Sequence, residues 1–219
     1  MGYPQVFAKG NNSRRCLRVL GVDPALAGAT GYGVIEFEGQ RVNLLNFGAL
    51  KLPARASFGT RLHEIHDLIS RLLKEYAPDV VAVESVFTAL NVKSALKLAE
   101  VRGVVLLAAA QAQTPAQSYS PREVKASVAG YGAASKRQMQ QMVGSLLGLA
   151  RCPEPADAAD ALAVALCHAQ LAQARERMAA STSVSGSATR RAVAPRSALQ
   201  DSLAVPGNRV RIARIQSSR

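Results

Sequence analysis

Two short apolar runs in this chain each end in a carboxylate, and this pattern constrains the fold more than any other feature. Val19–Val22 leads into Asp23, and Val80–Val83 leads into Glu84. Short runs of consecutive apolar residues are typical of strands that are buried on both faces of a parallel sheet. In open α/β sheets, sites form outside the carboxyl ends of such strands. Asp23 and Glu84 are therefore predicted to lie at a functional edge of a sheet.

A second pair of acids lies three residues apart in a predicted helix. Asp157 and Asp160 are the only polar side chains of the segment 156–162. Asp157 alone carries little weight, because an Asp near a helix start usually caps the helix or pairs with its dipole. Asp160 is more informative, since it shares a helix face with Asp157, with Cβ atoms roughly 5–6 Å apart. Without a cation, the repulsion between the two should raise the pKa of one of them.

Four carboxylates in apolar surroundings need compensation, because burying a bare charge costs many kcal/mol. No cationic side chain neighbours any of the four in the sequence, and we interpret them as ligands of a divalent metal ion. Two of them also have ordinary structural interpretations. Asp23 precedes Pro24, and Asp-Pro often begins a turn. Glu84 could end a solvated strand that faces Lys93 or Lys97.

Ligands that are all oxygen favour Mg²⁺ or Mn²⁺ over zinc. The histidines fit this interpretation by their positions. His63 and His66 share a predicted helix at i, i+3 with no evident acidic partner, so we expect them to serve surface or core packing. His168 lies eight residues after Asp160 and is kept as a candidate for the outer shell of the metal site.

Four cations and one aromatic residue suit a nucleic-acid substrate. Lys125, Lys136, Arg122 and Arg137 all lie within sixteen residues of one another. A Lys close to a metal-bound phosphate can offset the charge that builds up in the transition state. Phe87, in the loop after the second apolar strand, could stack on a base. The alternatives are a solvated helix face for the cations and a place in the core for Phe87.

Periodicity and turn signals predict one α/β domain. Ser57–Tyr76, for example, carries a helical apolar stripe that ends before Pro78. The order of elements indicates a five-stranded mixed sheet with helices on both faces. We expect strands at 17–23, 30–38, 41–51, 79–84 and 117–119, and helices at 57–76, 91–112, 121–129, 135–149 and 156–178.

The net charge of +12 is unevenly distributed along the 219 residues. Residues 172–219 contain nine Arg and two acids, a net +7, and the first 171 residues have a net +5. A basic surface around an acidic centre suits a polyanionic substrate. We expect a mobile arm at 1–15, a folded domain at 16–178 and a disordered Arg-rich tail at 179–219.

Other sequence signals narrow the cellular setting. No run approaches 18 uncharged apolar residues, so we expect no membrane span. The first sixteen residues lack the continuous apolar region of a signal peptide. Cys16, Cys152 and Cys167 have no metal-type spacing and are odd in number. We therefore expect free thiols in a reducing cytoplasm.

Five segments, taken in order, resemble the RuvC family of Holliday-junction resolvases within the ribonuclease H-like nucleases. The likeness runs over about residues 17–171. The order of the segments makes the resemblance specific, since single pieces of this kind are weak signals. The segments are VLGVDPALAGATGYGVIEF (19–37), DVVAVESVF (79–87), NVKSALKLAEVRG (91–103), REVKASVAGYGAASKRQM (122–139) and ADAADALAVAL (156–166).

The resemblance implies a ribonuclease H-like fold that works as a homodimer. Each subunit would nick one strand of a four-way DNA junction at symmetric positions during homologous recombination and DNA repair. Asp23, Glu84, Asp157 and Asp160 would hold the metal, with two Mg²⁺ ions per subunit and Mn²⁺ as a possible substitute. A branch-migration complex of RuvA and RuvB would be a partner. Such chemistry is a two-metal hydrolysis of a phosphodiester.

By the same resemblance, Lys125 and Lys136 match active-site lysines and Phe87 matches a junction-contacting aromatic. Arg122 and Arg137 are candidate DNA contacts from their position beside these lysines. Ser85 departs from the family pattern, which more often has Gln or another long polar residue there.

Three other functions fit part of the pattern. A ribonuclease H-like enzyme that trims ribosomal RNA precursors shares the Gly-x-Asp first motif, but lacks the 91–103 helix. A sugar-kinase or actin-like phosphate binder needs a second Gly-rich loop and a longer chain. A pure DNA-binding module would explain the charge and leave Asp160 without a purpose.

Overall fold

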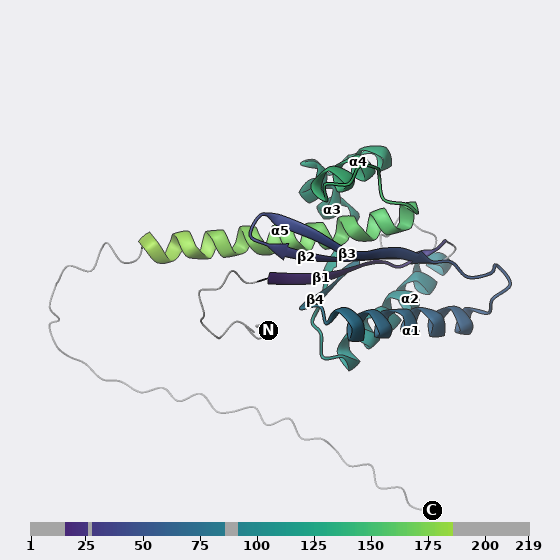
Figure 1. The fold of residues 1–219 in the computed structure, drawn as a ribbon. Coiled ribbons are helices and arrows are strands. Elements are labelled where there is room, and N and C mark those ends of the chain that lie inside the picture. The colour runs from purple at the N-terminus through teal and green to yellow at the C-terminus, as the bar shows by residue number, and fades with distance from the viewer. Residues whose placement is uncertain (1–15, 26–27, 86–91, 186–219) are drawn as a thin grey trace, which may run out of the picture.

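The computed structural model describes residues 16–25, 28–85 and 92–185, which form a mixed five-stranded sheet between layers of helices (Figure 1). The strand order is β3-β2-β1-β4-β5. β1 pairs antiparallel with β2 and parallel with β4, and β4 pairs parallel with β5. The strands are β1 Cys16–Asp23, β2 Thr30–Glu38, β3 Arg41–Leu50, β4 Val80–Glu84 and β5 Ala116–Tyr119. The expected mixed sheet is confirmed.

The helices divide between the two faces of the sheet (Figure 1). α1 and α2 cover one face, while α5 crosses the other and carries α3 and α4 on its outer side. A hydrophobic core lies on each face of the sheet, because side chains along a strand point alternately to the two faces. In β1, Leu20 and Val22 face α1 and α2, while Val19 faces α5. The helices are α1 Phe58–Tyr76, α2 Val92–Gln111, α3 Pro121–Ala129, α4 Lys136–Leu146 and α5 Ala156–Ser185.

Side-chain caps explain why three of these helices begin where the sequence predicts. Ser57 accepts a hydrogen bond from the Thr60 backbone at the start of α1. Ser120 with Glu123, and Ser135 with Gln138, form reciprocal capping boxes before α3 and α4. Each cap satisfies backbone N–H groups that have no partner inside the helix.

Two helix ends differ from the sequence-based expectation. α4 stops at Leu146 and not at Leu149, because Gly148 takes a positive φ of 64° and the Leu149 N–H bonds back to the Gly144 carbonyl. α5 continues to Ser185, seven residues past the expected end, since the first helix breaker in the sequence is Gly186. The expected arm at 1–15 and the rest of the expected tail lie outside the described residues.

The expectation that His63 and His66 have no acidic partner is wrong. Asp67 approaches both, at 3.4 Å from His63 Nε2 and 3.5 Å from His66 Nδ1. His63 and Asp67 are four residues apart, a spacing that brings side chains together on a helix surface. His66 also joins α1 to α2 through a 2.8 Å hydrogen bond between its Nε2 and Gln111 Oε1. His66 therefore contributes to packing between α1 and α2, whereas His63 lies exposed on the surface of α1.

His168 lies on α5 and is buried where this helix packs against Tyr119 of β5, so it is not part of the acid cluster. Its Nδ1 lies 2.7 Å from the Tyr119 hydroxyl, and the two rings meet edge to face with centroids 5.8 Å apart. Burial lowers the pKa of His168 to about 4, and the positive charge of Arg175 adds to the effect. The imidazole is therefore neutral in the folded protein at neutral pH and belongs to the core.

Two further observations concern the cysteines and the apolar character of the helices. The cysteines are free thiols, with Cys167 buried and the other two exposed. Among the helices in the described ranges, none is both long and apolar enough to cross a bilayer.

The depressed pKa of His168 predicts that stability falls on acidification. Between its ordinary value of 6.5 and about 4, the unfolded chain binds one proton that the folded chain excludes. The contribution of His168 to the free energy of unfolding is therefore complete above pH 6.5. It is lost as the pH falls towards 4, which lowers that free energy by roughly 3 kcal/mol. Urea unfolding at pH 7 and pH 5 should show a smaller drop for His168→Phe than for the unmodified chain. Equal drops would contradict the assignment, and Tyr119→Phe is the control that keeps the histidine.

Candidate active site

β1 and β4 deliver two acids to the same edge of the sheet. The strands are neighbours and parallel, with Val22 opposite Val83, so Asp23 and Glu84 leave the sheet side by side. A hydrogen bond joins their carboxyl groups. Two carboxyls can bond in this way only when one of them holds a proton. The predicted meeting of the two strand ends therefore occurs, at the edge where parallel strands of open sheets form sites.

Three glycines allow α5 to lie directly on the backbone of β1 and β2. Gly31 is paired with Asp23 across the strands, and a Cβ at Gly31 would overlap the backbone carbonyl oxygen of Asp157. A Cβ at Gly21 would overlap the carbonyl oxygen of Ala161, and one at Gly33 would press on the Leu162 side chain. The first turns of α5 are thereby held against the strand end that carries Asp23.

These glycines were not predicted from the sequence to have a role in the site. The signal was present, because glycine inside a strand often marks close approach by another segment. Gly31 and Gly33 alternate in β2, which places them on one face, and Gly21 lies opposite Gly33 in β1. The three together leave a flat patch on the sheet, which is covered by the backbone of α5 at Gly21 and Gly31 and by the Leu162 side chain at Gly33.

All four acids form one electrostatic cluster. The pKa of Asp23 is raised to about 9, mainly by burial, and the nearby carboxyls of Glu84, Asp160 and Asp157 contribute to the rise. Burial also raises the pKa of Glu84, while its hydrogen bond to Asp23 opposes that rise. Burial therefore makes it unfavourable for Asp23 and Glu84 to be ionised together. Charges interact this strongly only at short range in a poorly solvated site.

Two of the predicted cations reach the cluster. Lys136 Nζ, at the start of α4, lies 2.8 Å from Asp160 Oδ2, and this contact raises the pKa of Lys136. Lys125 on α3 is close enough to Glu84 to lower the pKa of that carboxyl. The outer layer of helices therefore supplies positive charge to an acidic centre built on the sheet and α5.

The other predicted DNA contacts do not pair with the acid cluster in the described residues. Arg122 on α3 lies against Gly132, and Arg137 is exposed on α4. Within the described ranges, no ion pair connects either arginine to the four acids. Phe87 lies outside the described residues. Ser85, at the departure from the family pattern, donates a 3.1 Å hydrogen bond to the Tyr119 carbonyl and so ties β4 to β5.

The acids engage one another and a lysine. In the part of the chain that the structure describes, no three His, Cys, Asp or Glu side chains are arranged as ready metal ligands. Asp23 and Glu84 share a proton, and Asp160 turns to Lys136. The donor set still fits a hard divalent cation, because all four groups are carboxylates gathered in a site that raises the pKa of Asp23.

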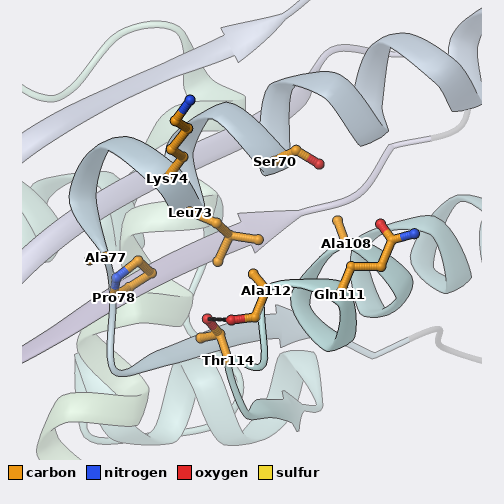
Figure 2. Close-up of a pocket in the computed structure, with 9 residues that line it drawn as sticks. All are labelled: Ser70, Leu73, Lys74, Ala77, Pro78, Ala108, Gln111, Ala112 and Thr114. Carbon is orange, nitrogen blue, oxygen red and sulfur yellow. Dashed lines mark hydrogen bonds between the residues drawn. The ribbon is translucent and has the colours of Figure 1, made fainter.

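A groove of about 470 Å³ lies far from this cluster (Figure 2). It is bounded by the C-terminal ends of α1 and α2 and by Pro78, at the start of β4, whereas Glu84 ends that strand. Its lining is mostly small or apolar, and the hydroxyl of Thr114 bonds locally to the Ala112 carbonyl. The chemistry-bearing residues are therefore gathered at the opposite edge of the sheet.

Comparison with known proteins agrees with this geometry. The family described as Crossover junction endodeoxyribonuclease RuvC matches residues 19–168. The chain belongs to the RuvC family. A RuvC of Syntrophomonas wolfei is 48% identical over 152 residues, covering 69% of this chain and 88% of that relative.

Solved RuvC structures match as well. Thermus thermophilus RuvC aligns with a TM-score of 0.67 and 35% identity, covering 73% of this chain and 97% of that one. T. thermophilus RuvC in complex with a Holliday junction substrate aligns with a TM-score of 0.65 and 32% identity, over 72% and 96% of the two chains. The predicted family, ribonuclease H-like fold and endonuclease class are confirmed. RuvC family members are metal-dependent nucleases.

The glycine patch predicts a sharp effect of one methyl group. Gly31→Ala places a Cβ against the Asp157 carbonyl, so it should destabilise the fold by about 1–3 kcal/mol and shift the start of α5. Urea unfolding measures the first effect, and junction nicking at a temperature where the variant is folded measures the second. Gly59→Ala is the matched control, since the nearest atom there is 3.9 Å away. Normal stability in Gly31→Ala would contradict the close contact.

Proposed function

We propose that this chain resolves four-way DNA junctions by metal-dependent hydrolysis of a phosphodiester at the cluster of Asp23, Glu84, Asp157 and Asp160. The observation that carries the proposal is the convergence of carboxylates from β1, β4 and α5 in a buried site, where burial first and the neighbouring acids second raise the pKa of Asp23 to about 9. The family match supports the junction as substrate, since a RuvC has been solved with a Holliday junction substrate. The reaction serves recombination and DNA repair.

We assign Mg²⁺ as the metal, two ions per subunit, with Mn²⁺ as a substitute. Hard carboxylate oxygens prefer these ions, and four carboxylates supply enough charge for two. When bound, such ions supply an attacking water of lowered pKa and stabilise the leaving 3′-oxygen. Asp23 gives up the proton that it shares with Glu84 when the four acids act as ligands, so metal binding should release protons.

The lysines have a second role in this proposal. Lys136 now neutralises Asp160 at 2.8 Å, and Lys125 acts on Glu84. A phosphate entering the site would lie between these lysines and the acids, where positive charge offsets the charge of the transition state. Arg122, Arg137 and Phe87 are proposed to position the DNA around that phosphate, since phosphate and stacking contacts fix register more than chemistry.

Loss of one carboxylate of the cluster should abolish cleavage of the four-way junction and leave junction binding intact. The variants are Asp23→Asn, Glu84→Gln and Asp160→Asn. Each removes a carboxylate that would hold the metal, and the metal stabilises the transition state by several kcal/mol, so the Mg²⁺-dependent nicking rate should fall at least about 100-fold. Single-turnover nicking of a four-way junction measures the rate, and a gel-shift assay in EDTA measures binding. Glu64→Gln on α1 is the control, because it changes an acid remote from the cluster. Cleavage at the normal rate in any of the three variants would end the proposal.

We propose that the enzyme acts as a homodimer through α2. Val92, Leu96 and Leu107 are 75%, 61% and 52% exposed and recur at helical spacing with Gly103 between them. A Cβ built on Gly103 meets no atom within 4 Å, so a second helix could approach closely there. Val92, Leu96, Gly103 and Leu107 follow one another at intervals of four, seven and four residues, which keeps them on one side of the helix, as in helices that pair side by side. Two subunits would place two active sites on the two strands that are nicked.

A charge in the α2 stripe should separate the subunits. Leu96→Glu buries a carboxylate in the proposed interface, so the dimer dissociation constant should rise at least about tenfold. Sedimentation velocity across a concentration series measures it. Leu45→Glu on β3 is the control, since Leu45 is also exposed but lies on another element. A monomeric parent chain, or an unchanged dimer in Leu96→Glu, would exclude this interface.

We further propose a cytoplasmic enzyme that works with a branch-migration complex of RuvA and RuvB. Three free cysteines suit a reducing compartment. The association with RuvA and RuvB rests on the family resemblance.

A further inference from the structure

Five cations gather where α1 and α2 begin, on the face of the sheet opposite α3 and α4. The segments 51–61 and 92–99, which carry them, contain no Asp or Glu. Four of the side chains are exposed, and that of Arg61 is half-buried. Together they are called the basic surface, and they are Lys51, Arg55, Arg61, Lys93 and Lys97.

The strand register places the basic surface close to the acid cluster. Asp23 pairs with Gly31 in β2, and Gly31 pairs with Ala49 in β3. Neighbouring strands are about 4.8 Å apart, so Ala49 lies about 10 Å from Asp23 along the same edge of the sheet. Lys51 follows two residues later, so its Cα is within about 17 Å of that of Asp23. In Figure 1, α1 and α5 both start on this side of the sheet.

One contact joins the starts of the two helices. Lys97 Nζ on α2 lies 5.6 Å from the ring centroid of Phe58, the first residue of α1. The electron-rich face of the ring attracts the ammonium group, and because the ring has no net charge, the lysine keeps its positive charge for an external partner. The cations of α1 and α2 therefore form one surface with those of the segment that leads into α1.

Positive charge is segregated along these elements. Residues 51–61 contain three cations and no acid, a net +3, whereas residues 62–79 contain two cations and four acids, a net −2. Within the described ranges, no ion pair involves any member of the basic surface. Like charges without acidic partners repel one another, so their gathering at one edge of the sheet is explained by an anion from outside the protein.

The acid cluster does not account for these cations. Lys136 lies 2.8 Å from Asp160, and Lys125 lowers the pKa of Glu84. Both lysines belong to α3 and α4, on the other face of the sheet. Exposed charges more than about 8 Å apart are largely screened at physiological salt. The basic surface therefore remains available to a polyanion that reaches the acids.

We propose that the basic surface binds the phosphate backbone of the DNA next to the scissile phosphate, on the side of the acids opposite Lys125 and Lys136. This inference rests on the proposed function, because it takes the phosphodiester at the acids as the bond that is cut. Phosphates of one strand are about 3.4 Å apart along the DNA axis, so a separation of about 17 Å spans about five nucleotides. The acids then lie between two groups of cations, one at the reacting phosphate and one along the adjoining duplex.

The contact is electrostatic and independent of base sequence. Cations on phosphates fix the position and direction of the duplex and carry no sequence information themselves. Each neutralised phosphate releases counterions and adds about 0.9 to the salt slope of binding. Removal of members of the basic surface should therefore weaken binding and lower its salt slope together.

The test uses the full chain with Lys51→Gln and Arg55→Gln combined, since both side chains are exposed and neither lies on the α2 helix proposed to pair the subunits. Binding of a four-way junction is measured in EDTA over a salt series. The salt slope should fall by about 1–2, and the dissociation constant at about 150 mM salt should rise at least about fivefold.

The matched control combines Arg71→Gln with Lys74→Gln. Both residues are exposed on α1 and lower the net charge equally, but they lie toward the end of the helix remote from the acids. This variant should bind the junction within about twofold of the parent, with an unchanged salt slope. Lys51→Arg combined with Arg55→Lys keeps the charge and should also bind within about twofold of the parent.

The outcomes separate this inference from the proposed function. Unchanged binding after the loss of Lys51 and Arg55, or an equal loss in the matched control, would overturn the basic surface as a DNA contact. A loss in the charge-keeping variant as large as in the Gln variant would overturn its electrostatic basis. Nicking with Mg²⁺ at low salt and saturating enzyme reports on the acids, and there the Gln variant should cut at the parent's rate. A parent chain that binds the junction without nicking it refutes the proposed function, while the comparison of affinities still decides the inference.

Discussion

The close contact between the backbone of α5 and the glycines of β1 and β2 determines where the acids lie. Asp23 is fixed by its strand, but Asp157 and Asp160 reach it only because Gly31, opposite Asp23, leaves room for the Asp157 carbonyl. Side chains at these positions would hold the helix away from the sheet. Because the acids interact only at short range, the absence of three side chains is as important to the cluster as the presence of four acids.

The repulsion between buried like charges is concentrated at this acid cluster. Four acids in a poorly solvated cluster raise the pKa of Asp23 to about 9, and the fold relieves the repulsion with a shared proton and with Lys136 at 2.8 Å from Asp160. A fold selected for stability alone would have no reason to keep this arrangement. The electrostatic repulsion has an explanation if a cation and a phosphate bind here as proposed. Each would replace a partner from within the protein by a stronger one from outside.

Much of this was visible in the sequence because the relevant signals are local. Apolar runs, caps such as Ser135 and the acids after two strands follow from neighbouring residues, and they predicted the sheet and the meeting of Asp23 with Glu84. What escaped prediction depends on contacts between distant segments. The role of Gly31 needs the register of β2 against α5, and the Tyr119–His168 pair needs the packing of α5 on β5. The length of α5 was missed because exposed helical residues carry no apolar periodicity.

The layered arrangement has an evolutionary consequence. α3 and α4 rest mainly on α5, on the side away from the sheet, while the strands and α5 carry all four acids (Figure 1). The outer layer contributes Lys125 and Lys136, and otherwise forms a surface above the centre. If the site cuts DNA as proposed, insertions or replacements in that layer away from the two lysines would alter which nucleic-acid shapes reach the acids without displacing the acids themselves. The architecture therefore places the four acids on one layer and, apart from Lys125 and Lys136, leaves the surface above them free to diversify.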